Sequence, residues 1–229
     1  MIVATTIEFT RAALCAALFL FACGVTSVRA EGGPANALLE AAAKGDAAAV
    51  ERSLAAGVKV EIRDAAGRTP LLLATHGNHI EAARLLIAAG ADVNAKDGIQ
   101  DSPYLYAGAH GRTEILKMTL AAGADLKSLN RYGGTALIPA CHYGHVDAVK
   151  VLLATNIDID HVNNLGWTAL LEAVILGDGG AVHTDIVRLL LEAGANPSIA
   201  DRGGVTPLGH ARRRGYAAMV RLLEARGAR

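Results

Sequence analysis

Residues 64–94 read DAAGRTPLLLATHGNHIEAARLLIAAGADVN, a sequence with a clear internal order. A polar turn leads into Thr69-Pro70-Leu71, two apolar segments follow, and a Gly-Ala-Asp tail ends the unit. The threonine side chain can cap the free N–H groups of a helix, and proline at the next position gives up no hydrogen bond there. Gly90, after the second segment, suits a left-handed helix end. The pattern therefore predicts two short helices joined by a turn.

The same pattern recurs along the chain. The capping residue returns at Thr69, Ser102, Thr135, Thr168 and Thr206, in three steps of 33 residues and one of 38. The residues that end the second helices, all glycine except an asparagine at position 156, follow the same steps with the same slip of five. Two independent markers with one period indicate a repeat protein. Because one helix pair cannot bury its apolar face alone, stability is expected to come from stacked neighbours.

These residues resemble the ankyrin repeat over about residues 35–229. The resemblance implies an all-α solenoid of about six stacked helix-turn-helix units with short hairpin-like loops. The repeat domain is expected to span 31–229. Its units are expected at 35–63, 64–96, 97–129, 130–162, 163–200 and 201–229.

Four departures from the family pattern carry predictions. Gln100 stands where the third unit should have its turn glycine, which predicts a distorted hairpin. Pro139 falls inside the first helix of the fourth unit, where a kink is expected. The fifth unit carries a five-residue insertion, 178–182, expected to form a flexible excursion between its helices. The histidine that usually follows Thr-Pro-Leu is absent from every unit, which favours a drier stack.

Composition excludes several classes of protein. The 22 Lys and Arg residues balance 22 Asp and Glu residues, so no net field draws this chain of 229 residues to nucleic acid or to an anionic membrane. An apolar content of 52% excludes a disordered chain. Aromatic residues make up only 4%, so Leu, Ile, Val and Ala are expected to fill the core.

An apolar run at residues 12–25 favours export. It is too short for a membrane-spanning helix, which needs roughly 20 residues, but it suits the apolar region of a signal peptide. Residues 1–30 are therefore expected to be a signal peptide cleaved after Ala30, and the protein to be periplasmic. The stretch Leu20-Phe21-Ala22-Cys23 leaves an alternative, in which Cys23 carries a lipid anchor at the cell envelope. Only Cys141 then remains in the repeats, so no internal disulfide is expected.

The resemblance implies a non-enzymatic module or scaffold that binds another protein through the concave face of the stack. A monomer with no catalytic residue, cofactor, metal ligand, membrane span or nucleic-acid partner is expected. Tyr and Trp, which are enriched at interface hot spots, occupy several variable positions of that face. The candidate partner-binding residues are Asp101, Tyr106, His110, Arg131, Tyr132, His142, Tyr143, Leu165, Trp167, Glu172, Leu176, Arg202 and Arg213.

Three alternatives stay open at this point. Cys141, His142 and the 178–182 loop suggest a metal-dependent or small-ligand activity, since thiol and imidazole groups bind metals. Cys141 nevertheless stands at a core position, and no fourth ligand is apparent. A structural component of the cell envelope is the second alternative. The third is that the aromatic residues only fill gaps between repeats, as Tyr104 is expected to do.

Overall fold

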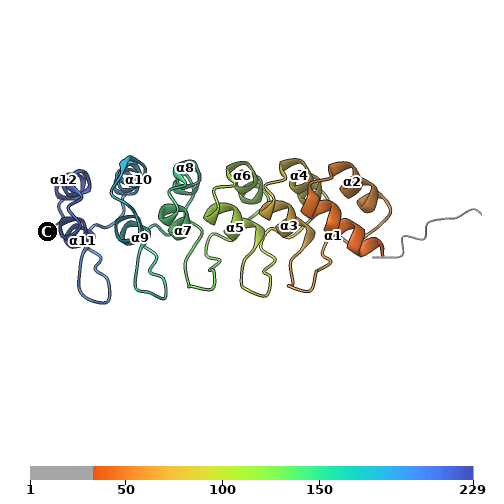
Figure 1. Cartoon of the computed structure of the whole chain (residues 1–229), viewed down its shortest axis with the longest axis horizontal. Coiled ribbons are helices and arrows are strands. Elements are labelled where there is room, and N and C mark those ends of the chain that lie inside the picture. The colour runs from red at the N-terminus through yellow and green to blue at the C-terminus, as the bar shows by residue number, and fades with distance from the viewer. Residues whose placement is uncertain (1–32, 229) are drawn as a thin grey trace, which may run out of the picture. The chain divides into compact units, whose positions relative to one another are not determined.

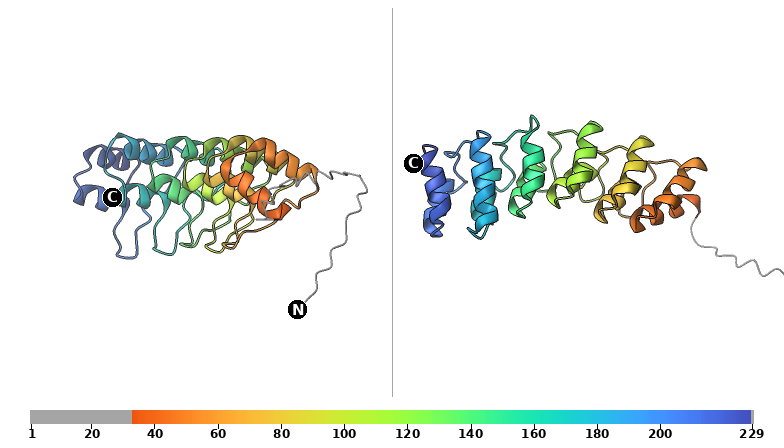
Figure 2. Two further views of the ribbon diagram at one scale, coloured as in Figure 1. Left: turned by 45° about the vertical axis from the view of Figure 1, so that its right-hand side comes forward. Right: turned by 90° about the horizontal axis from the view of Figure 1, so that it is seen from above.

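The computed structural model describes residues 33–228, and both the expected signal peptide and Cys23 lie outside this range. The described residues form six helix pairs and no strand, which confirms the all-α stack (Figure 1). The first helices of the pairs form one row, the second helices form another, and the hairpin loops extend from the first row (Figures 1 and 2). The helices are α1 Pro34–Lys44, α2 Ala47–Ala55, α3 Pro70–His76, α4 Ile80–Ala88, α5 Pro103–Ala109, α6 Thr113–Ala121, α7 Leu137–His142, α8 Val146–Leu153, α9 Ala169–Ile175, α10 Ala181–Glu192, α11 Pro207–Arg213 and α12 Ala217–Ala225.

Four of the first helices begin directly after the expected capping residue. The hydroxyl of Thr69 accepts a hydrogen bond from the Leu72 N–H at 3.2 Å, and Ser102, Thr168 and Thr206 cap α5, α9 and α11 in the same way. Each cap satisfies one of the N–H groups that a helix start leaves free.

Small and aliphatic side chains fill the core. The fully buried residues are almost all Leu, Ala, Ile and Val, and the helix pairs pack against one another along the whole stack. Tyr104 is fully buried among them, which confirms that it fills the core. Cys141 is also fully buried, and burial raises the pKa of its thiol. The core is therefore continuous from one repeat to the next.

The second, fifth and sixth repeats are each bonded to the preceding repeat by a side chain at the start of the second helix. His79 donates from Nε2 to the Ala43 carbonyl at 3.0 Å, and its ring lies where a Cβ on Gly45 or Gly77 would overlap it. In the fifth repeat the Nε2 of His183 donates to the His142 carbonyl at 2.9 Å. The Tyr216 hydroxyl likewise donates to the carbonyl of Gly177 at 3.0 Å in the sixth. These bonds tie the start of one second helix to the end of the preceding first helix.

The hairpin of the third repeat keeps the geometry of the others, contrary to the predicted distortion. Gln100 has a φ of 69°, close to the 71° of Gly133 at the equivalent position. Its N–H donates to the Asp97 carbonyl at 3.2 Å, as the Gly133 N–H does to the Asn130 carbonyl. The third repeat therefore forms the same turn by holding a glutamine in a left-handed conformation that favours glycine.

Pro139 shortens its helix at the start rather than kinking it. Helix α7 begins at Leu137, so Pro139 is its third residue and stands within the first turn. A proline there cannot donate to the carbonyl of the capping residue, a bond that Leu73 makes to Thr69 at 3.0 Å in the second repeat. The buried hydroxyl of Thr135 is left without a hydrogen-bond partner. The helix start therefore loses both its backbone bond and its cap.

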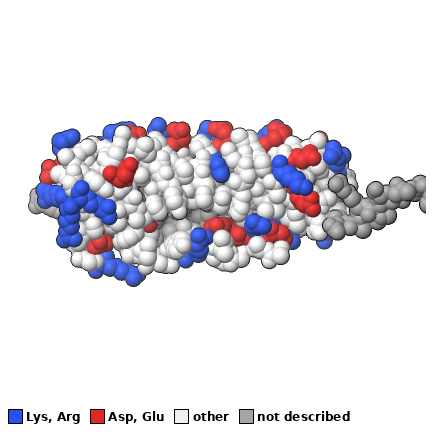
Figure 3. Space-filling model, viewed as in Figure 1, with Lys and Arg blue, Asp and Glu red and all other residues white. Residues whose placement is uncertain are grey.

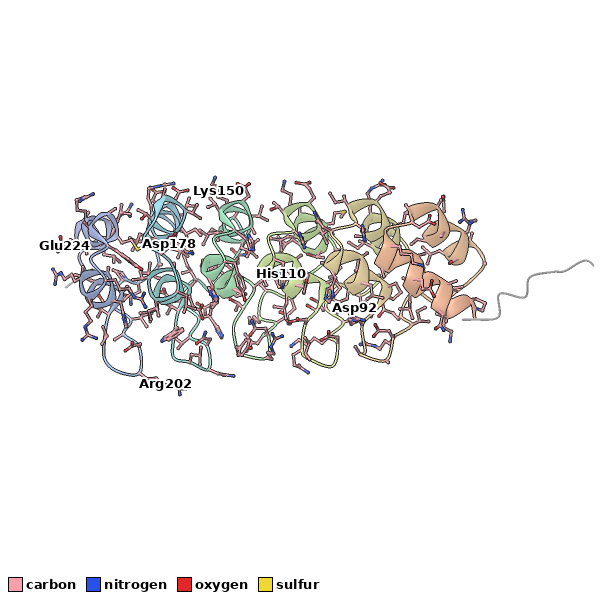
Figure 4. The ribbon with its side chains drawn as sticks, in the orientation of Figure 1. Asp92, His110, Lys150, Asp178, Arg202 and Glu224 are labelled. Atoms are coloured by element: carbon pink, nitrogen blue, oxygen red, sulfur yellow. The ribbon has the colours of Figure 1, made fainter. Side chains whose placement is uncertain are left out.

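The insertion in the fifth repeat is divided between the interhelical connection and a lengthened helix, so the connection is shorter than the expected excursion. Helix α10 begins at Ala181 and has 12 residues, against 9 in α4 and α6. Only residues 178–180 of the insertion lie between the helices. Asp178 accepts hydrogen bonds there from the Gly180 N–H and the His183 ring. Figure 4 shows Asp178 between α9 and α10.

Candidate functional site

A hollow of about 260 Å³ opens on the side of the stack that carries the first helices and the hairpins. It extends over the third, fourth and fifth repeats, so residues distant in the sequence meet around it. Helices α5, α7 and α9 contribute from one side and three hairpins from the other. The lining residues are Asp101, Ala109, His110, Asn130, Arg131, Tyr132, Gly134, Ile138, Pro139, His142, Tyr143, Asn163, Leu165, Glu172 and Leu176.

One sequence position explains why the space lies in the middle of the stack. Four residues after the capping residue, successive repeats have Leu73, Tyr106, Pro139, Glu172 and His210. The fourth repeat alone has the compact ring of proline, which lines the hollow together with Glu172 of the next repeat. A longer side chain in the fourth repeat would occupy part of this volume.

Stacked rings form the wall on the N-terminal side. Tyr106 lies between His76 and His110, with ring centroids 3.9 Å from each. Tyr143 stacks on His142 at 4.3 Å and faces His110 at 6.2 Å. Burial lowers the pKa of His76, His110 and His142, so neutral imidazoles are favoured in this stack. Figure 4 shows His110 at the end of α5, in the middle of the molecule.

The rim is largely apolar and exposed. Tyr132 and Tyr143 are 55% and 57% exposed, and Leu165 and Leu176 also face solvent. Arg131 lies 4.9 Å above the Tyr132 ring and 3.5 Å from the Asp101 carboxylate. Asn130 holds the hairpin tip in place, because its Oδ1 accepts from the N–H groups of Tyr132 and Gly134. The exposed Tyr132 ring therefore projects from a well-defined turn.

Glu172 is the buried acid of the hollow. Its side chain is only 7% exposed, and its Oε1 accepts from the Asn163 amide at 3.1 Å. Its Oε2 lies 3.7 Å from Nδ1 of His142, beyond hydrogen-bond distance. Burial raises the pKa of Glu172 to about 7, although the bond from Asn163 lowers it. The carboxyl group can therefore change its protonation state near neutral pH.

Most of the predicted partner-binding residues come together around the hollow, and four do not line it. Tyr106 does not line the hollow but stacks on His110, which does. Trp167 is half-buried, and Arg202 lies at a hairpin tip, where it donates to the Asn164 carbonyl (Figure 4). Arg213 is exposed near the C-terminal end, where basic side chains gather (Figure 3). The nine lining residues are Asp101, His110, Arg131, Tyr132, His142, Tyr143, Leu165, Glu172 and Leu176.

Sequence reasoning missed several residues of the site. Asn130 and Asn163 start their hairpins at the position that Asp64 has in the second repeat. The alignment of the repeats could therefore have identified them. Pro139 was interpreted only as a helix breaker, although it lies at the groove-facing position. His76, at the end of the ring stack, stands at the same place in its repeat as His142.

Cys141 and His142 do not form a joint site. The Cys141 thiol is in the core, whereas His142 lines the hollow. The inserted residues 178–182 do not line the hollow either. Within residues 33–228 no three His, Cys, Asp or Glu side chains are grouped as metal ligands would be. Over the same range no helix is long and apolar enough to cross a bilayer.

The family profile described as "Ankyrin repeats (3 copies)" matches residues 8–97 and 104–201. An ankyrin repeat protein of Escherichia coli (strain K12), YahD, is 49% identical over 55 residues, which are 24% of this chain and 27% of YahD. The chain thus matches about a quarter of the length of that relative.

Solved structures are similar over most of the chain. An ankyrin repeat domain from Acinetobacter baumannii AYE has 58% identity and a TM-score of 0.82, over 84% of this chain and 98% of that domain. The ankyrin repeat protein EF0377 has 48% identity and a TM-score of 0.80, over 83% and 97%. The ankyrin domain of Bcl-3, a member of the IκB family, has 31% identity and a TM-score of 0.76, over 84% and 86%. The chain therefore belongs to the ankyrin repeat family, whose members typically bind other proteins and are generally non-catalytic.

Proposed function

We propose that this protein binds a partner protein through the face that carries the hollow, around the third to fifth repeats. One observation carries the proposal: exposed apolar and aromatic side chains from two neighbouring repeats surround one hollow. Tyr132, Tyr143, Leu165 and Leu176 are each more than 40% exposed there. Such side chains gain apolar burial only when a partner covers them.

The geometry favours binding without rearrangement. The ring stack holds Tyr143, and the turn started by Asn130 holds Tyr132. A partner that docks on these rings therefore meets side chains that already have restricted freedom. Because ordering costs less at a preformed surface, a modest contact area can give useful affinity.

A double substitution of the exposed rings tests this function. Tyr132→Ala with Tyr143→Ala should abolish partner capture, measured by crosslinking in the native host, purification and quantitative mass spectrometry. The melting temperature should change little, since both side chains are more than half exposed. Ile80→Ala, an exposed apolar position on α4, is the matched control and should leave capture intact.

Three results would count against the proposal. Capture that persists in the double variant would place the binding surface elsewhere. A large loss of stability would show that the rings pack the fold instead. A purely structural component of the envelope would give no saturable partner in the same experiment. Trp167→Ala, outside the hollow, is expected to leave capture unchanged.

We also propose that the protein is exported and acts as a monomer. The support for export is the apolar run at 12–25 and the small residue at Ala30. Mass spectrometry of the protein purified from its host should give an N-terminus at Glu31. An acylated Cys23 would establish the lipid-anchored alternative, and an intact Met1 would contradict export. Size-exclusion chromatography with light scattering measures the mass in solution.

A further inference from the structure

Glu172 is a buried carboxyl group without a cationic partner. Glu172 lines the hollow; its Oε1 accepts a hydrogen bond from Asn163, while its Oε2 has none from the described residues. His142 is the group in an ion-pair arrangement with it, at 3.7 Å, and burial lowers the pKa of that imidazole. A buried carboxylate is costly unless it is paired, so this oxygen has an unmet need for a donor.

The protein's own arginine at the rim does not supply that donor. Arg131 is 3.5 Å from Asp101, and its guanidinium lies 4.9 Å above the Tyr132 ring. The Asp101–Arg131 pair is neutral overall, so Glu172 leaves the hollow with one unbalanced acidic group. The pair also shows that a guanidinium fits at this rim between a carboxylate and a tyrosine ring.

We propose that the hollow receives an arginine side chain of the partner protein, whose guanidinium donates to Oε2 of Glu172. This inference rests on the proposed function and specifies the chemistry of the partner. Arginine suits the site better than lysine because its planar, weakly hydrated group stacks on aromatic rings and donates several hydrogen bonds at once. The exposed Tyr143 ring and the histidine stack supply the flat surface, and Glu172 supplies the acceptor.

A selection of random displayed peptides on the immobilised protein tests this chemistry without knowledge of the partner. The protein is offered as wild type, Glu172→Gln, Tyr143→Ala and Glu51→Gln. The Glu172→Gln substitution keeps the shape of the side chain and its contact with Asn163 while it removes the charge. Glu51, exposed on α2, is the matched control for loss of one acidic residue. Melting curves of all four confirm that each is folded.

The expected result is a set of peptides that share an arginine and depend on both Glu172 and Tyr143. For a selected peptide, arginine to alanine should weaken binding about 10-fold or more, and arginine to lysine by less. Glu172→Gln should cause a similar loss, with little further loss when both changes are combined, because they remove the same contact. Glu51→Gln should change nothing.

The outcomes separate this inference from the proposed function. Peptides that require Tyr143 but contain no arginine, or bind equally to Glu172→Gln, overturn the arginine inference and leave the binding face in place. A lysine peptide that equals its arginine counterpart overturns it too. Peptides that ignore Tyr143, or no enrichment at all, overturn both.

Discussion

The second and fourth repeats share one pattern and differ where the hollow lies. In the second, Thr69 caps α3, and Leu73 donates to its carbonyl and fills the groove-facing position. In the fourth, the Thr135 hydroxyl has no hydrogen-bond partner, α7 has only six residues, and the compact ring of Pro139 lines the hollow without filling it. The fourth repeat thus lacks stabilising contacts at the point where the molecule offers a cavity. The side chain of Pro139 lowers the stability of the fourth repeat and leaves the surface open, and such a combination is common at functional sites.

Glu172→Gln should change the pH dependence of stability more than any other substitution here. The pKa of Glu172 is about 7 in the folded protein, against a usual 4.5. The folded state therefore binds more protons than the unfolded state between these values. The free energy of unfolding should fall as pH rises from 4.5 to 7, by at most about 3 kcal/mol. Urea unfolding at pH 5 and pH 8 should show this decline in the wild type and not in the variant.

His142, which lies 3.7 Å from Glu172, is present in both proteins, so the difference between the two isolates Glu172. Glu51→Gln should keep the wild-type decline. If Glu172→Gln kept the full decline in the free energy of unfolding, Glu172 would not be its source. The fifth repeat would then not differ from the others in its pH dependence.

Pro139→Leu should give the fourth repeat the same helix start and the same groove-facing residue as the second. The restored N–H can donate to the Thr135 carbonyl, and the longer side chain fills part of the hollow. The free energy of unfolding should rise by about 1–2 kcal/mol, while binding of peptides that require Tyr143 is lost. Pro103→Leu is the control, since Pro103 starts α5 and costs no bond there. A destabilised Pro139→Leu protein with intact binding would break the comparison.

Thr69→Val and Thr135→Val sharpen the same contrast, because the two residues are buried alike at 1% and 2% exposure. Thr69→Val should cost about 1 kcal/mol, since the Leu72 N–H loses its cap. Thr135→Val should be neutral or slightly stabilising, since it removes a buried hydroxyl that lacks a partner. Equal losses, measured by urea unfolding, would show that Thr135 is also a cap.

Gln100→Gly should give a modest gain, about 0.5–1 kcal/mol, by relieving the left-handed backbone of the third hairpin. Gly133→Ala at the equivalent position should destabilise, because its φ is 71° and its Cβ would overlap the Asn164 side chain. Thermal unfolding measures both. A loss of stability in Gln100→Gly would mean that the glutamine side chain contributes more than its backbone costs.

The repeat period predicted the fold, and the register within each repeat predicted most of the lining of the hollow. Other features could not be predicted from one repeat, because they depend on its neighbours. Trp167 occupies a hairpin position, yet its side chain does not reach the hollow. Pro139 was expected to kink a helix, but as the third residue of a late-starting helix it removes a backbone hydrogen bond at the helix start. The burial of Glu172 depends on neighbours from two repeats, among them His142 and Asn163, which no local pattern records.

The rings that bridge neighbouring repeats have a consequence for inheritance. The His79 ring fits between Gly45 and Gly77. Gly45 belongs to the first repeat, whereas His79 and Gly77 belong to the second, so the two halves of this contact are encoded in different repeats. A duplication in whole periods would copy both halves together. The last joint is different, because Tyr216 meets Gly177 and Gly179 within the lengthened repeat. The sixth repeat is thus matched to the fifth as a pair, and recombination would have to move the two together.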